Sequence, residues 1–593
     1  MGKTTEKAIS LGLRVERKFT KDLQAGKSVF DMFNWKKVDV HLKDWNSGKV
    51  LTDMEGLDFP ENYSQNACDI IASKYFRKKG IPQAGHETSL RQVIHRMVNF
   101  WVLSMVDSGL VAAGEQQQIV YDELCYTMLS QMWAPNSPQW FNTGLQHAYG
   151  ITGSSNGHFY YDIEAGEVRQ SGDSYTRTQG SACFILGVKD SLLGEKSLLE
   201  TMMTETLLFK YGSGVGSNWS NIRGKDELLS GGGKSSGLLS FLKVSDRNAG
   251  AIKSGGTTRR AAKMNILDLD HPEVMEYIQW KSREEDKVAD LGRLGYNTSM
   301  DGEAYDTVSG QNANNSLRVP DAFMRLLDEE GAVWRTKGRV TDAIDKDVDV
   351  QHIWEEIAKA AWRCGDPGVQ YDDIINAWHT SPAGEDGLLW AKDANGNEAN
   401  KHNKINGSNP CSEYLFLDDT ACNLASINIL KFYDQKNNGF DVDSYIHTIQ
   451  LVQMVLEATI HWGQFPTADI ARKSHKFRTT GIGLTNIGAL LMYMGIPYDS
   501  SRARNLTAAL CSIMTGYSYY TSALMAEAIG AFECYELNAA HMKRVIGNHQ
   551  AAAGCRENFE DMPYIPLVID HDTLRRIGMG NVAECLAEAW ELA

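Results

Sequence analysis

Short apolar runs, glycine-dense loops and helical patterns alternate between residues 180 and 272 of this chain. Residues 180–188 and 264–269 are apolar runs typical of buried strands. A helical pattern at about 191–210, with Asp190 placed to cap it, follows the first run. Asp270-His271-Pro272 follows the second run and predicts another helix start. This order predicts an α/β domain with ligand-binding loops at its strand ends.

The flanking sequence is mainly helical in pattern. Residues 1 to about 178 are predicted to be mostly helical, and helical patterns dominate again from about 440. The separate helices are expected at these ranges: 90–111, 117–133, 445–462, 484–494 and 503–527. Between these regions, residues 384–409 are polar and rich in turn formers, which predicts a loop.

Charge and composition exclude several classes of protein. The chain has 59 Lys and Arg against 75 Asp and Glu, a net charge of −16, which disfavours wrapping of duplex DNA. Its 42% apolar and 23% charged residues are typical of a packed globular protein. No apolar run approaches the about 18 residues of a membrane span, and residues 1–7 lack the apolar core of a secretion signal. We therefore expect a cytoplasmic chain without membrane or nucleic-acid polymer partners.

The chain has ten cysteines, and none of them forms a Cys-x-x-Cys motif. A zinc ribbon is excluded by this spacing, and no set of metal ligands is predicted. Most of these thiols should be small buried apolar residues. Any that carry chemistry should do so as thiols or thiyl radicals.

Two glycine-rich stretches are candidates for binding phosphate. The loop at 231–236 (GGGKSS) fits a phosphate loop only in part, so it is either a flexible loop near a nucleotide or a plain surface loop. In the stretch 255–260 (GGTTRR), Arg259 and Arg260 follow a glycine turn. They either hold phosphate or belong to a solvated charged turn.

The most reactive combination of side chains is Asn409-Pro410-Cys411-Ser412-Glu413. In an extended segment, alternate residues point the same way, so an amide, a thiol and a carboxylate would share one face. Cys422 and Cys183 lie in strand-like runs. The three thiols are either one redox pair with one reactive centre, or three cysteines buried for packing.

These motifs, in this order, resemble the catalytic subunit of ribonucleotide reductases, and most closely the class II branch that depends on adenosylcobalamin. The resemblance covers nearly the whole chain. It is carried by residues 59–80, PNSPQWFN at 135–142, residues 212–286, residues 300–323, NPCSEYLFLDDTACNLASINIL at 409–430 and ARKSHKFRTTGIGLTNIGALLMYMGIPYDS at 471–500.

The resemblance implies a ten-stranded α/β barrel of two five-stranded halves, with a finger loop that carries a radical cysteine into its centre. It divides the chain into an N-terminal helical domain at 1–178, a first half-barrel with effector loops at 179–400, the finger loop and following strand at 401–430, and a partial, mostly helical second half-barrel at 431–593.

The resemblance also assigns the chemistry. Cys411 would pass its hydrogen atom to the cofactor radical, Glu413 would accept a hydroxyl proton, and Asn409 would hold the substrate's hydroxyls. Cys183 and Cys422 would close a disulfide as a ribonucleotide is reduced. This activity is that of a ribonucleoside-diphosphate reductase with a thioredoxin-like reductant, although the sequence does not distinguish diphosphate from triphosphate substrates.

Further site residues follow from the same resemblance. The substrate pocket matches Ser137, Ala182, Cys183, Gly214, Asn409 and Glu413. The site for a deoxynucleotide effector matches Asp190, Ser191, Leu192, Arg223, Lys234, Arg259 and Arg260. Two loops, at about 228–237 and 253–262, would join effector to substrate. Residues 481–488 (GIGLTNIG) would form a wall of the cobalamin site, and the helix at 191–210 would pack against its copy in a homodimer.

Two departures from the family pattern are expected to matter. The N-terminus lacks an ATP-cone motif, so we do not expect overall control by ATP and dATP. The printed sequence lacks a loop for substrate phosphates and the remaining barrel strands. A second polypeptide or a missing C-terminal segment would then complete the barrel, and this chain alone would bind effector but reduce substrate poorly. The alternatives are a class I catalytic subunit and a non-catalytic nucleotide-binding fragment.

Overall fold

The structure is a computed structural model, and it describes residues 12–44, 48–252, 261–299, 302–388, 391–392, 398–399, 403–437 and 439–593. The chain divides into two compact units. One unit comprises Met1–Ser181 together with Cys422–Ala593, and the other comprises Ala182–Ala421. The domain boundaries proposed from the sequence stay a prediction.

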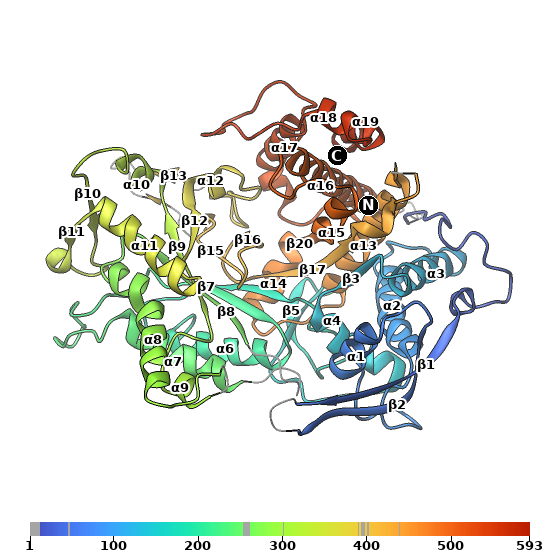
Figure 1. The fold of residues 1–593 in the computed structure, drawn as a ribbon, viewed down its shortest axis with the longest axis horizontal. Coiled ribbons are helices and arrows are strands. Elements are labelled where there is room, and N and C mark those ends of the chain that lie inside the picture. The colour runs from blue at the N-terminus through green and yellow to red at the C-terminus, as the bar shows by residue number, and fades with distance from the viewer. Residues whose placement is uncertain are drawn as a thin grey trace, which may run out of the picture. The chain divides into compact units, whose positions relative to one another are not determined.

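A parallel sheet forms the centre of the Ala182–Ala421 unit (Figure 1). Its strands, in spatial order, are β12 (Gly368–Tyr371), β9 (Asn314–Val319), β8 (Ala262–Asp268), β7 (Gly214–Asn218) and β6 (Cys183–Leu186). Parallel neighbours require crossover connections. The helices in these connections include α6 (Leu198–Lys210), α7 (Leu238–Ala251), α8 (Val274–Arg293) and α11 (Val350–Cys364). The α/β class predicted from the alternating pattern is confirmed.

The two faces of this sheet have different neighbours. Leu267 of β8 and Leu317 of β9 belong to an apolar core with residues of α7, α8 and α11. Ile266, which points to the other face because side chains alternate along a strand, lies against Gly407. One face therefore packs on helices and the other on the segment around residue 407.

The remaining elements of this unit are short. They are α9 (Glu303–Thr307), α10 (Asp321–Leu326), α12 (Asp372–Ala377), the hairpin of β10 (Val333–Thr336) and β11 (Lys346–Asp349), a 3₁₀ turn at Asp342–Ile344, and the paired strands β13 (Ala391–Lys392) with β14 (Glu398–Ala399) and β15 (Gly407–Ser408) with β16 (Leu415–Phe416).

The other unit is rich in helices. They are α1 (Gln65–Lys74), α2 (Leu90–Asp107), α3 (Glu115–Leu129), α4 (Ser137–Asn142), α5 (Leu145–Tyr149), α13 (Val442–His461), α14 (Ala468–Phe477), α15 (Ile487–Tyr493), α16 (Ser501–Ile529), α17 (Tyr535–Ala552), α18 (His571–Arg576) and α19 (Gly580–Leu592), with 3₁₀ turns at Val29–Met32 and Ile429–Phe432. Apolar residues of α2, α13, α16 and α19 form one core. The helices expected from the sequence in both flanks are confirmed, with ends that differ by several residues.

The strands of this unit pair as follows. β17 (Thr420–Asn428) pairs in parallel with β20 (Thr480–Thr485) and antiparallel with β3 (Trp133–Pro135). The other pairs are β1 (Trp35–Lys43) with β2 (Val50–Pro60), β4 (Phe159–Asp162) with β5 (Glu167–Gln170), and β18 (Tyr433–Asp434) with β19 (Gly439–Phe440).

Several expectations from the sequence differ from the structure. The antiparallel strands β1 and β2 interrupt the N-terminal region that was expected to be mostly helical, and Val38, Val40 and Leu57 of these strands are buried. The helix expected at 191–210 begins at Leu198, since Ser197 rather than Asp190 caps it. Residues 214–218 lie in the glycine-dense region between 180 and 272, where no strand was expected, and form β7.

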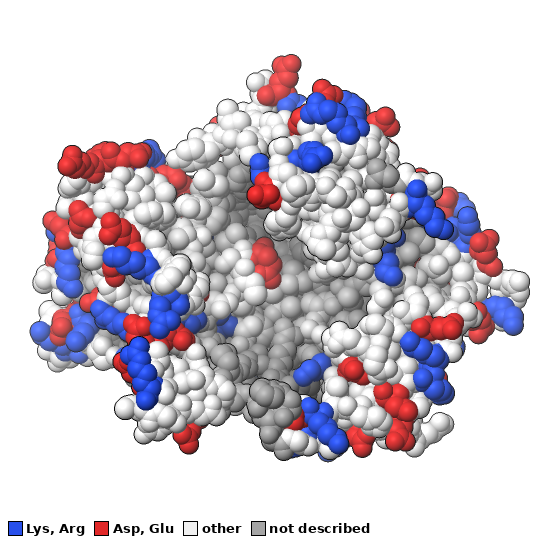
Figure 2. Space-filling view, viewed as in Figure 1, with Lys and Arg blue, Asp and Glu red and all other residues white. Residues whose placement is uncertain are grey.

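Acidic and basic side chains lie beside one another on the face drawn in Figure 2. Ion pairs of the Ala182–Ala421 unit include Arg363 with Asp286 and Arg335 with Asp345. Among the described residues, no helix combines the length and the apolar character needed to cross a membrane.

Candidate functional site

Residues 409–414 form the tip of the β15–β16 hairpin, which we call the cysteine hairpin (residues 407–416). Asn409 N–H donates to Tyr414 O at 3.1 Å, and Tyr414 N–H donates to the Asn409 side-chain oxygen at 3.0 Å. Ser412 has a left-handed backbone, with φ of 65°. The tip is therefore a tight turn, and the expected extended segment with three side chains on one face was wrong. Asn409 is buried, whereas Cys411 and Glu413 are exposed.

Two of these side chains contact Cys183, the first residue of β6. The Asn409 amide nitrogen donates to Cys183 Sγ at 3.0 Å, and Cys183 Sγ donates to Glu413 Oε1 at 3.4 Å. The Asn409 oxygen already accepts from Tyr414, so its nitrogen must face the sulfur. The structure thus brings together an amide, a buried thiol and an exposed carboxylate beside the turn that carries Cys411.

Two glycines of β7 allow the cysteine hairpin to approach the sheet. A Cβ atom at Gly216 would lie 1.8 Å from Ser408 O, and one at Gly214 would lie 2.7 Å from Pro410 Cγ. Atoms cannot approach so closely, so only glycine, which has no Cβ atom, fits at these two positions. The alternating glycines of a short strand are the sequence signal for this contact, but the sequence reasoning identified only Gly214.

A charged network fixes the segment that leads into the hairpin. Asp372 accepts from Arg318 Nη2 and from Lys404 Nζ, both at 2.5 Å. Arg318 also donates to Ile405 O at 2.6 Å. Burial raises the pKa of Asp372, but the charges of Arg318 and Lys404 outweigh it and hold the pKa below its usual range. The ionised carboxylate of Asp372, which follows β12, therefore joins Arg318 of β9 to the residues just before the cysteine hairpin.

Side-chain amides hold the hairpin along its length. Asn218 donates to Asn406 O and Asn314 donates to Pro410 O, both at 2.9 Å. Gln370 of β12 donates to Ser408 Oγ at 2.9 Å and to Ser412 Oγ at 3.0 Å. None of these amides was singled out from the sequence, since each lies far from the hairpin along the chain.

The predicted substrate residues divide between the two units. In the Ala182–Ala421 unit, Gly214 N–H donates to Ala182 O at 2.7 Å and Gly214 pairs with Cys183 in the sheet. Ala182, Cys183 and Gly214 therefore lie together at the start of β6 and β7. Ser137 belongs to the other unit, where it opens α4 and its hydroxyl lies 3.1 Å from the Tyr75 hydroxyl.

Cys422 also belongs to the other unit and is buried in β17. A Cβ atom at Gly481, on the paired strand β20, would lie 3.2 Å from its sulfur. The next residue, Asn423, accepts hydrogen bonds from Asn136 and Gln139. The pairing of Cys183 with Cys422 stays a prediction.

The described residues of the predicted effector site lie around an ion pair. Arg223 Nε donates to Asp190 Oδ2 at 2.7 Å, and Arg223 also donates to Leu228 O. Leu192 is exposed, and Ser191 donates to Leu193 O. Lys234 lies 3.8 Å from Asp226. Arg259 and Arg260 lie outside the described residues.

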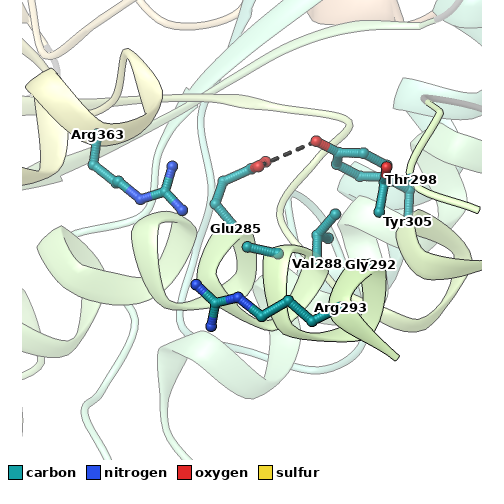
Figure 3. A pocket seen from close by; sticks show the side chains of 8 residues that line it. Glu285, Val288, Gly292, Arg293, Thr298, Tyr305 and Arg363 are labelled. Carbon is teal, nitrogen blue, oxygen red and sulfur yellow. Dashed lines mark hydrogen bonds between the residues drawn. The ribbon is translucent and has the colours of Figure 1, made fainter. Parts of the chain in front are cut away.

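A separate cavity of about 550 Å³ lies among α8, α9 and α11 (Figure 3). Arg293 and Arg363 line it, and the Tyr305 hydroxyl donates to Glu285 across it. None of the predicted site residues lines this cavity.

Comparison with known proteins gives family matches over most of the chain. Residues 181–566 match the family "Ribonucleotide reductase, barrel domain", and residues 37–131 match "Class II vitamin B12-dependent ribonucleotide reductase". The chain is similar to the vitamin B12-dependent ribonucleotide reductases of Agrobacterium fabrum (39% identical over 94% of this chain and 50% of the relative) and Streptomyces coelicolor (41% identical over 91% and 50%). It is also 30% identical, over 60% of this chain and 41% of the relative, to the vitamin B12-dependent ribonucleoside-diphosphate reductase of Thermoplasma acidophilum.

The parallel α/β sheet with its cysteine hairpin and these matches agree on one class of protein. The chain belongs to the ribonucleotide reductase family, within its class II, vitamin B12-dependent branch. The class I alternative is not favoured, because the family match at 37–131 is specific to class II. The chain spans about half the length of the curated relatives it matches.

Proposed function

We propose that the protein reduces ribonucleotides to 2′-deoxyribonucleotides by thiyl-radical chemistry. The observation that carries this proposal is the contact of Cys183 with both Asn409 and Glu413, on the hairpin whose tip is Cys411. This arrangement combines a hydrogen-atom carrier, a proton acceptor and a reducing thiol within one small region.

Each residue then has one role. The Cys411 thiyl removes the hydrogen atom from the ribose 3′ carbon, while Glu413 accepts the 3′-hydroxyl proton and Asn409 orients the hydroxyls. The 2′-hydroxyl leaves as water. Cys183 and Cys422 supply two electrons and two protons and become a disulfide. Cys411 finally returns its hydrogen atom to the 3′ carbon and Glu413 returns its proton to the 3′ oxygen, so both residues are unchanged after each turnover.

The family implies adenosylcobalamin as cofactor, and features of this chain fit it. The thiol that must meet a radical, Cys411, is exposed at a hairpin tip. Residues 480–484 of β20 are only half-buried although they lie in a sheet, and no atom would contact a Cβ at Gly483 or Gly488. We propose residues 481–488 as one wall for the flat cofactor. When bound, adenosylcobalamin supplies the radical that removes the hydrogen atom from Cys411.

We further propose a deoxynucleotide effector near Asp190, Ser191, Leu192 and Arg223. The loops at 228–237 (with Lys234) and 253–262 (with Arg259 and Arg260) would connect it to the substrate site. A thioredoxin-like dithiol would reopen the disulfide, which suits the reducing cytoplasm. Ribonucleoside diphosphates and triphosphates are both compatible with the residues named.

The test is to mix the chain with adenosylcobalamin, a ribonucleotide and a deoxynucleotide in the absence of oxygen. We expect an electron paramagnetic resonance signal from a thiyl radical at Cys411. Cys411→Ala should abolish this signal. Cys364→Ala, which changes a half-buried thiol at the end of α11, is the matched control and should retain it.

An equal signal from Cys411→Ala, or no signal from the unaltered chain, would contradict the proposal. A second measurement omits the reductant. Each deoxynucleotide formed should then accompany one new disulfide, mapped by mass spectrometry to Cys183 and Cys422.

A further inference from the structure

We propose that Gln370, on β12, is a positioning residue for the radical cysteine. It holds the two serines that bracket the Asn409-Pro410-Cys411 turn. This inference rests on the proposed function of Cys411 and adds a residue that the reaction does not itself touch. Gln370 is buried, and its side-chain nitrogen lies 2.9 Å from Ser408 Oγ and 3.0 Å from Ser412 Oγ.

The orientation of the Gln370 amide is determined by its neighbour. Arg318 lies directly opposite Gln370 in the parallel β9–β12 pair, and Arg318 Nη1 donates to Gln370 Oε1 at 3.4 Å. A guanidinium group has only donors, so it must face the amide oxygen. Both amide hydrogens are then directed to the serines.

The serine hydroxyls complete a consistent set of donors and acceptors. Ser408 Oγ donates to Asn409 O at 3.0 Å, which leaves its oxygen free to accept from Gln370. The two serine oxygens lie 3.4 Å apart, so Ser412 can donate its own hydrogen to Ser408. Every hydrogen of the three side-chain groups has an acceptor in this arrangement.

The anchoring extends from the tip to the hairpin base. Arg318 donates to Gln370 and also to Asp372 and Ile405 O, and Asp372 binds Lys404 beside Ile405. A buried ion pair is a rigid support because either charge left alone would be costly. Gln370 therefore links the ion pairs of Asp372 to the tip of the cysteine hairpin through neutral hydrogen bonds.

The Gln370 bond to Ser412 acts at a backbone position that needs support. Ser412 has a φ of 65°, a left-handed backbone conformation that residues other than glycine seldom adopt. This residue is the one between Cys411 and Glu413. If Ser412 relaxes, the thiol and the carboxylate both move, and hydrogen-atom transfer depends steeply on such displacements.

The experiment compares Gln370→Leu with the matched control Gln351→Leu, which alters an exposed glutamine at the start of α11. The first readout needs no cofactor. Amide hydrogen exchange at 408–414 and alkylation of Cys411 should both become about tenfold faster in Gln370→Leu. The second readout is the radical signal of Cys411. Its rate of formation should fall roughly 10- to 100-fold while the nucleotide concentration for half-saturation changes little.

Ser412→Ala removes the other end of the hydrogen bond and tests the same inference if Gln370→Leu does not fold. It should reproduce both effects, and the double variant should be no worse than either single variant. Unchanged exchange, or an unchanged radical rate beside a normal signal from the unaltered chain, overturns the role of Gln370. If the unaltered chain gives no radical signal while hairpin exchange responds as expected, the proposed function fails and the anchoring of the hairpin stands.

Discussion

At the scale of single residues, the site depends as much on absent side chains as on reactive ones. The cysteine hairpin contacts β7 through Gly214 and Gly216, and its backbone oxygen at Ser408 occupies the place of a side chain at residue 216. On the same hairpin, the side chains of Asn409 and Glu413 contact Cys183, at the start of the neighbouring strand β6.

Gly216→Ala is therefore expected to displace the hairpin. Its Cβ would lie 1.8 Å from Ser408 O, a backbone atom that cannot move without moving the turn. We expect a loss of roughly 1–3 kcal/mol in the free energy of unfolding and faster alkylation of Cys411. Urea unfolding and thiol labelling measure the two effects. Gly231→Ala is the control, because no atom lies within 4 Å of its Cβ position. Equal stability of the two variants would contradict this account.

At the scale of elements, α6 and the loop before it have apolar side chains on their exposed surface as well as on the side that faces the core. Leu198, Met202 and Leu208 are buried, whereas Leu199 is 42% and Met203 70% exposed. Leu192 and Leu193, in the preceding loop, are 54% and 70% exposed. Such a patch beside the proposed effector residues favours a contact between two copies of the chain.

We predict that α6 forms a homodimer interface. Met203→Lys places a charge on this surface without disturbing the buried side of the helix, so it should shift the chain toward monomer. Sedimentation at micromolar concentration with a deoxynucleotide measures the shift. Leu294→Lys, at a residue 76% exposed just after α8, is the matched control. A monomeric unaltered chain would rule the interface out.

At the scale of the whole molecule, each unit has a histidine whose surroundings lower its pKa. Burial, with the positive charge of Arg339, lowers the pKa of His271 to about 4. Its ring nitrogens are both occupied, since Nε2 donates to Ile222 O and Nδ1 accepts from Glu273 N–H. Burial likewise lowers the pKa of His549, which stacks on Trp590, to about 4.

The pH dependence of stability follows from these two pKa values. Between pH 6.5 and about 4 the unfolded chain binds protons that the folded chain does not, so the free energy of unfolding should fall as the pH falls through this range. Each histidine contributes at most roughly 3 kcal/mol to this loss. Urea unfolding at pH 7 and pH 5 measures it.

His271→Gln and His549→Gln should each flatten the pH profile, since glutamine does not titrate. The exposed His352→Gln is the control and should leave the profile unchanged. Identical profiles for all three variants would show that the acid sensitivity has another origin.

The sequence by itself determined the α/β class, most of the helices and the residues of the cysteine motif. These features depend on local patterns of apolar residues and on short motifs, which neighbouring residues are enough to define. The comparisons confirmed the family that the motifs indicated.

Only the tertiary structure decided how the motif is used. Asn409 and Glu413 meet Cys183 across more than two hundred positions of chain, and Gln370 meets Ser412 from another strand. The turn at Ser412, the start of α6 at Leu198 and the strand at 214–218 were likewise not apparent from sequence. Each depends on a partner that is distant along the chain or on a single cap, and such contacts leave no periodic trace in the residues that make them.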